Sequence, residues 1–202
     1  MRTAQTQAVT LVLISGIVIA LVAVAYMWGK PLIDKRSTVI QFTSAIRFVE
    51  DLDKRIVRMA GTCTGQCEES LNLPVPGLII LDEENNSMLY EFQVNQPLIT
   101  KDEIPINTGN LGDVARYGDT PGVITLKGEE TSANVYTLKF RIRYRELDDE
   151  NLLRGYKIKL SGSGRKTGNT RVVIRYAGSE LKGGEAHNNG DLVLSKIEMQ
   201  TV

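Results

Sequence analysis

The chain has 202 residues, enough for one domain of ordinary size or for one domain with an anchor. Basic and acidic residues balance at 24 each, so no excess charge points to a nucleic-acid partner. Aromatic residues make up only 6% of the chain and glycine occurs 18 times, which favours strands and turns over a large aromatic-lined pocket. The first 30 residues are mostly apolar and the remainder is polar and charged, so we expect two parts with different surroundings.

Residues 8–28 form a run of 21 residues without a charged side chain. At about 1.5 Å per residue, such a helix is roughly 30 Å long and matches the hydrocarbon core of a bilayer. Tyr26 and Trp28 stand at one end of the run, where aromatic residues gather at membrane interfaces. We therefore expect a membrane-crossing helix that the working protein keeps.

Two alternatives explain the same run. A secretory signal peptide has an apolar stretch of about 7–15 residues followed by a small-x-small cleavage site, and its removal leaves a soluble binding or adhesive domain. Here the stretch is longer, and the bulky Tyr26, Met27 and Trp28 stand where that site belongs. A buried core helix is disfavoured because no other segment is apolar enough to surround it.

A second helical pattern covers residues 37–60. Its apolar residues recur at intervals of three or four, as on one face of an amphipathic helix. Ser37 is a candidate N-cap, although the helix can also continue from the first segment through a kink at Pro31, and Gly61 is a natural stop. We expect one long helix over residues 5–60, whose amphipathic face packs on its own globular domain or against neighbouring subunits. The apolar stripe comprises Val39, Phe42, Ile46, Val49, Leu52, Ile56 and Met59.

Cys63 and Cys67 follow this helix in the sequence CTGQC. Two cysteines do not complete a four-thiol zinc site, and the single histidine, His187, is distant in sequence. A redox pair is more usually spaced C-x-x-C. We expect a short structural disulfide, with two free thiols as the alternative.

The orientation of the helix rests on two conflicting signals. The basic residues Lys30, Lys35 and Arg36 outnumber Arg2, which by itself places the C-terminal side in the cytoplasm. A disulfide indicates an oxidising, extracytoplasmic compartment. We follow the cysteines and expect the C-terminal domain outside the cytoplasm.

Residues 61–202 carry short strand-like runs separated by turns. In Val135–Arg145 the side chains alternate between apolar and charged, which indicates a strand with one buried and one solvated face. The glycine-rich residues 161–169 predict a hairpin between their flanking strands, and Glu146–Leu153 predicts a short helical turn. Some seven or eight strands then predict an α+β protein, with a long N-terminal hydrophobic helix followed by an antiparallel β-sandwich head domain. The other predicted strands are Gly77–Leu81, Met88–Val94, Gly122–Leu126, Tyr156–Leu160, Thr170–Tyr176 and Asp191–Met199.

No motif for catalysis or for a cofactor stands out. Lys166 and Thr167 follow glycines as in a phosphate loop, but Arg165 replaces the required glycine. His187 has no marked nucleophile or orienting acid, since Ser195 and Asp191 belong to a predicted strand. The acidic runs 82–84 and 148–150 lack a calcium-loop pattern and are expected to be solvated loops. We expect no enzyme, cofactor or metal.

One modification motif is present. Asn85 opens the sequon Asn85-Asn86-Ser87 in a predicted exposed turn, which makes it a candidate for N-glycosylation.

The N-terminal quarter resembles an archaeal type IV pilin or archaellin-like subunit. The resemblance rests on the short polar leader Met1-Arg2-Thr3-Ala4, the long hydrophobic helix that Gln5 opens, its amphipathic continuation and the β-rich head. It implies that residues 1–4 are a class III signal peptide, which a prepilin peptidase removes between Ala4 and Gln5. Val9 stands at the fifth mature position, where bacterial pilins carry glutamate, so the archaeal branch fits better.

The resemblance further implies a structural subunit of a pilus-like filament that serves cell adhesion. The helix lies in the membrane before assembly and in the filament core afterwards, where Gly16, Ala20, Ala23 and Trp28 contact other copies. The partners are then copies of the same chain, the membrane and the peptidase, with the head at the cell surface. The alternative is an uncut, monotopic membrane-anchored β-sandwich that binds a cell-envelope partner, such as a surface layer or an archaellum stator.

Overall fold

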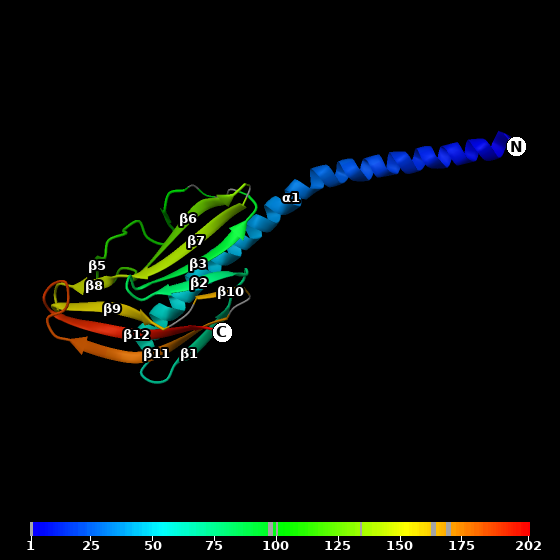
Figure 1. Ribbon diagram of the computed structural model, residues 1–202. Helices are drawn as coiled ribbons and strands as arrows, with labels where there is room; N and C mark the ends of the chain where they lie inside the picture. Colours follow the sequence, from blue (N-terminus) through cyan, green and yellow to red (C-terminus); the bar gives the residue numbers. More distant parts are fainter. Residues whose placement is uncertain (1, 97–98, 100, 134, 163–164, 169–170) are drawn as a thin grey trace. The chain divides into compact units, whose positions relative to one another are not determined.

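The computed structural model describes the backbone of residues 2–96, 99, 101–133, 135–162, 165–168 and 171–202, and side chains from Leu11 onward. It contains two compact units, Met1–Ile40 and Gln41–Val202 (Figure 1). We call them the N-terminal unit and the C-terminal unit and describe each by itself. Met1, the first residue of the predicted leader, lies outside the described residues.

The single long helix, α1, extends over Arg2–Thr62. Pro31 lies inside it and no N-cap interrupts it at Ser37, so the predicted continuation past Pro31 is confirmed. The proline lacks a backbone donor, so the helix continues through it with one hydrogen bond fewer. The helix ends at Thr62, one residue after the predicted stop at Gly61. The Thr62 hydroxyl donates to the carbonyl of Arg58 at 2.8 Å.

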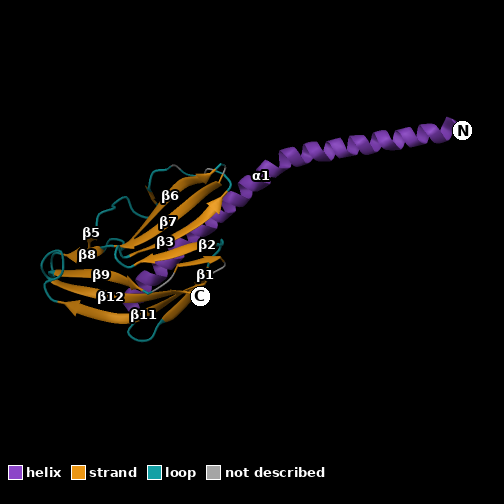
Figure 2. Cartoon of the chain, in the orientation of Figure 1, coloured by secondary structure: helices purple, strands orange, loops and turns teal. Residues whose placement is uncertain are grey.

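The described strands form two six-stranded sheets in the C-terminal unit (Figure 2). The first sheet has the order β1-β11-β12-β9-β8-β5 and the second has the order β10-β2-β3-β7-β6-β4. All pairings are antiparallel except β12 with β9 and β5 with β8. The predicted α+β class with a β-rich head is therefore confirmed. The strands are β1 Glu68–Asn72, β2 Gly77–Asp82, β3 Ser87–Val94, β4 Ile104–Pro105, β5 Val114–Arg116, β6 Gly122–Ser132, β7 Val135–Tyr144, β8 Glu146–Asp149, β9 Arg154–Ser161, β10 Arg165–Gly168, β11 Arg171–Lys182 and β12 Asp191–Thr201.

The last part of α1 lies in the core between the two sheets (Figure 1). The Phe48 ring meets the Tyr90 ring of the second sheet edge-on, at 5.6 Å between centroids. On the opposite side, the Ser195 hydroxyl of the first sheet donates to the Ala60 carbonyl at 3.2 Å. From Phe42 onward the predicted apolar stripe is thus used by the domain's own core, whereas Val39, its first predicted residue, is exposed. The buried stripe residues are Val49, Leu52, Ile56 and Met59, with Phe42 and Ile46 partly buried beside them.

The predicted alternation in residues 135–145 is confirmed over residues 138–142 of β7, while Thr137 on the predicted solvated face is buried. Leu138, Phe140 and Ile142 are buried, and Arg141 on the other face is exposed. Arg145 departs from the pattern because it is buried although its parity predicts a solvated face. Its guanidinium donates to the carbonyls of Asn110 and Thr120, so the segment that precedes β6 covers it.

Two local predictions are wrong. The strands on either side of residues 161–169 do not pair with each other, because β12 separates β9 from β11 in the first sheet and β10 joins β2 in the second. Residues 146–149 form strand β8, which pairs with both β9 and β5, so only residues 150–153 make a turn.

Asn86 ties the second sheet to the first. Its amide nitrogen donates to the carbonyls of Tyr144 and Ile158 at 3.0 and 2.6 Å, and its amide oxygen accepts from the backbone N–H of Leu160 at 2.7 Å. The backbone φ of 49° at Asn86 lies in the left-handed region, which asparagine tolerates better than most residues. This side chain replaces backbone pairing where the two sheets meet.

Candidate functional site: the apolar surface of the helix

The N-terminal unit presents an apolar surface on every side of α1. Thirteen large apolar side chains between Leu11 and Trp28 are exposed, each over 51–77% of its surface. Soluble domains rarely leave such a continuous apolar surface in water. The helix is long and apolar enough to cross a membrane. A protein that keeps this segment needs lipid or other protein to cover the surface, whereas a signal sequence would lose it on cleavage.

The small residues that the sequence singles out lie on this surface. Ala20 and Ala23 are exposed, and a side chain added at Gly16 meets no other atom within 4 Å. Trp28 is exposed over 77% of its surface, and the Lys30 ammonium lies 5.9 Å from the centre of the Tyr26 ring. A belt of aromatic and basic residues thus closes the apolar run, as at a membrane interface.

The predicted processing residues Ala4 and Gln5 lie in the first turns of α1. Their side chains fall outside the described residues, and cleavage between them stays a prediction.

Cys63 and Cys67 form a disulfide with a Cα–Cα distance of 6.3 Å. Backbone hydrogen bonds hold the two cysteines in place. The Cys63 N–H donates to the Met59 carbonyl at 3.1 Å, and the Cys67 carbonyl accepts from the Tyr176 N–H at 3.0 Å. The predicted disulfide is present in the structure, while the extracytoplasmic placement inferred from it stays a prediction.

The remaining candidates are held in local contacts. The backbone N–H of His187 donates to the Glu146 carboxylate at 2.7 Å, and the Ser195 hydroxyl donates to the Ala60 carbonyl in α1. Within the described part of the chain, no hydrogen bond joins the side chains of His187 and Ser195. Asp82 accepts from the side-chain amide of Asn85 at 2.7 Å. Asn85 is exposed in the turn between β2 and β3, and its glycosylation stays a prediction. Among the described residues, no three potential ligands gather to hold a metal ion.

Sequence reasoning missed a buried acidic group at the interface between α1 and the second sheet. Asp53 is only 6% exposed and accepts a 2.9 Å hydrogen bond from the Tyr144 hydroxyl, which is itself buried. Burial raises the pKa of the Asp53 carboxyl, and the hydrogen bond from Tyr144 partly opposes that rise. A polar residue next to the apolar stripe carries no local signal that it will be buried.

Sequence reasoning also missed a cleft that contains aromatic side chains. Tyr117, Tyr156 and Tyr176 line a hollow of about 910 Å³ beside the last turn of α1. The low aromatic content argued against such a cleft, but three of the seven tyrosines gather in it. Their wide separation in sequence hides the grouping.

The chain matches no protein-family model, no curated protein and no solved structure. The fold therefore defines the protein only as a β-rich domain that follows a long apolar helix.

Proposed function

We propose that the protein is a structural subunit of an extracellular, type IV pilus-like filament that polymerises through the first part of α1. The observation that carries the proposal is the uncovered apolar surface from Leu11 to Trp28. Burying thirteen such side chains is worth on the order of 20 kcal/mol, which exceeds the whole stability of most domains.

The C-terminal unit does not use this surface for its own core. Its apolar cluster begins at Ala45 and includes side chains of α1 and of both sheets. Folding and assembly can thus draw on separate parts of one helix. The stripe from Phe42 to Met59 stabilises the head, and the run from Leu11 to Trp28 remains for lipid or for other copies.

Assembly under this proposal exchanges lipid for sister helices around the same uncharged residues. No charged side chain occurs from Leu11 to Gly29, so no ion has to leave water or cross hydrocarbon during the exchange. The small residues Gly16, Ala20 and Ala23 permit close approach of neighbouring helices. A contact between different faces of successive copies builds a helix rather than a closed ring.

Substitution of Gly16 tests the proposal in the native host. Gly16→Leu introduces no clash within the chain, because nothing lies within 4 Å of the added Cβ. We expect the variant to enter the membrane normally and to lose filaments in electron micrographs of the cell surface. Val18→Leu is the matched control, since it enlarges an already large, exposed side chain and should leave assembly intact. Filaments that persist in a strain without this gene contradict the proposal.

A membrane anchor is the second candidate function. The observation in its favour is that the helix is long and apolar enough to cross a membrane, which requires no cleavage. An uncut chain would hold the head at the membrane for a cell-envelope partner. The mass of the mature N-terminus separates the two candidates, because an anchor keeps Met1 and a pilin begins at Gln5.

A further inference from the structure

The core face of the first sheet extends beyond the end of α1. On β9 the side chains of Tyr156, Ile158 and Leu160 point to one face, and in register with them on β12 lie Val193, Ser195 and Ile197. Leu160 and Ile197 are fully buried. Tyr156 and Val193 are only partly covered, because α1 ends at Thr62 before it reaches them.

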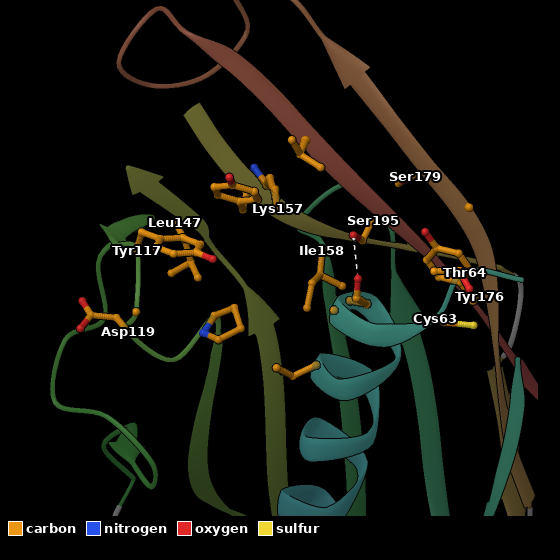
Figure 3. Close-up of a pocket in the computed structure, with 18 residues that line it drawn as sticks. Cys63, Thr64, Tyr117, Asp119, Leu147, Lys157, Ile158, Tyr176, Ser179 and Ser195 are labelled. Carbon is orange, nitrogen blue, oxygen red and sulfur yellow. Dashed lines mark hydrogen bonds between the residues drawn. The ribbon is translucent and has the colours of Figure 1, made fainter. Parts of the chain in front are cut away.

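The uncovered part of this face is the floor of the cleft (Figure 3). Figure 3 places Tyr117 and Leu147 at one end and Tyr176 beside Thr64 at the other, with Ile158 and Ser195 between them. The cleft is therefore elongated. Its volume of about 910 Å³ lies in the range of roughly 300–1,000 Å³ that is usual for ligand sites.

Tyrosine gives the cleft both apolar faces and polar tips. Tyr117 is 59% exposed, and its ring centroid lies 4.9 Å from that of Tyr156. Within the described part of the chain, none of the hydroxyls of Tyr117, Tyr156 and Tyr176 forms a hydrogen bond to protein, so all three remain available to a ligand. The two charged residues at the edge, Asp119 and Lys157, have opposite signs.

Hydrogen bonds to the backbone around Tyr117 hold it in place. The Tyr117 N–H donates to the Asp148 carbonyl at 2.8 Å, next to the pairing of β5 with β8. Three residues further on, the Thr120 carbonyl accepts from the buried guanidinium of Arg145. The exposed ring thus projects from a fixed loop, which lowers the entropy cost of binding.

We propose that this cleft binds a segment of an uncharged carbohydrate chain. A sugar ring presents C–H groups on its faces and hydroxyls around its edge, and it matches tyrosine rings that offer an apolar face and a free hydroxyl. The balanced charge favours a neutral ligand over an acidic one. The elongated, open form suits a stretch of a polymer better than a compact metabolite. The site belongs to the C-terminal unit alone and does not depend on polymerisation.

The test uses the full-length protein in detergent micelles on an array of neutral hexose and N-acetylhexosamine oligosaccharides, with chains containing uronic acids and extended apolar peptides as competitors. We expect a neutral oligosaccharide to bind, and Tyr117→Ala to weaken that binding at least tenfold. Tyr117→Phe, which keeps the ring, should weaken it less. Leu111→Ala removes an exposed side chain that precedes β5 and lies outside the cleft lining, and it should leave binding unchanged.

A second variant guards against an indirect effect of the first. Ser179→Trp adds bulk at an exposed position of the cleft lining and should abolish binding while the melting temperature stays within a few degrees. The proposal is overturned if no neutral oligosaccharide binds, if binding survives both variants, or if acidic chains or peptides bind more tightly. Filament assembly is scored separately, so either proposal can fail alone.

Discussion

The hydroxyl of Tyr144 donates to the carboxylate of Asp53 across 91 positions of sequence, and this bond joins α1 to the last residue of β7. Both side chains are buried, so neither exchanges its partner for water at low cost. The pair lies where Gly122 starts β6, and a Cβ at Gly122 would collide with the Asp53 carboxylate. The absence of a side chain at Gly122 therefore leaves room for the buried hydrogen bond between α1 and the second sheet.

The buried carboxyl of Asp53 makes the stability of the domain depend on pH. Burial raises the pKa of Asp53, so the folded chain holds this proton more tightly than the unfolded chain. The stability from this group is present below the ordinary pKa of about 3.8 and is lost as pH rises through the raised folded value. We expect Asp53→Asn, which keeps an acceptor for Tyr144, to unfold at higher temperature than the wild type at neutral pH.

Thermal unfolding of both proteins in the same detergent across pH checks this expectation. The advantage of Asp53→Asn should shrink as pH falls and vanish near pH 3.8. An advantage that is independent of pH would show that Asp53 is not the responsible group.

The two parts of α1 should respond differently to the same substitution. Leu52 is fully buried in the core, so Leu52→Ala should lower the free energy of unfolding by about 2–5 kcal/mol. Leu32 lies in the same helix but is 62% exposed, and Leu32→Ala should change it by less than about 0.5 kcal/mol. Denaturant unfolding of the full chain measures the free energy of unfolding of each variant. Equal losses would contradict the claim that only the later part of α1 stabilises the domain.

Adjacent asparagines provide a matched pair at the junction of the two sheets. Asn86→Ala removes three hydrogen bonds and places alanine at a positive φ, so we expect a loss of about 3 kcal/mol. Asn85→Ala alters an exposed turn and should cost under about 0.5 kcal/mol. The same two variants test glycosylation by mass spectrometry of protein from the native host. If Asn85 carries a glycan, Asn85→Ala should lose the glycan mass and Asn86→Ala should keep it. Similar losses of stability for both variants would argue against the bridging role of Asn86.

The disulfide tests the placement of the head. Cross-linking residues four apart should stabilise the fold by about 2 kcal/mol, so Cys63→Ser with Cys67→Ser should lower the unfolding midpoint. In intact cells, an impermeant thiol reagent should label the wild type only after treatment with an impermeant reductant. Labelling without reductant would indicate free thiols, and labelling only after lysis would place the head in the cytoplasm.

Local periodicity accounts for what the sequence predicts correctly. Two patterns repeat within a few residues: the helical stripe from Ile46 to Met59 and the strand alternation of Leu138, Phe140 and Ile142. In each, the local sequence predicts which face is buried. The spacing of Cys63 and Cys67 is equally local. Each of these features needs no knowledge of a distant partner.

Long-range pairing accounts for what the sequence hides. Arg145 is buried because its guanidinium donates to the carbonyls of Thr120 and Asn110. These partners lie 25 and 35 residues away in sequence, so the local pattern does not indicate them. The strand β10 leaves the expected hairpin because β2, far earlier in the chain, pairs with it. Tyr117, Tyr156 and Tyr176 share a cleft only once β5, β9 and β11 are placed in one sheet.

The mass of the mature N-terminus, measured on protein from the cell surface, tests the central claim most directly. The account predicts a product that begins at Gln5 and retains the apolar residues 8–28. A product that begins after Trp28 would contradict it, because the surface on which assembly depends would then be absent from the working protein.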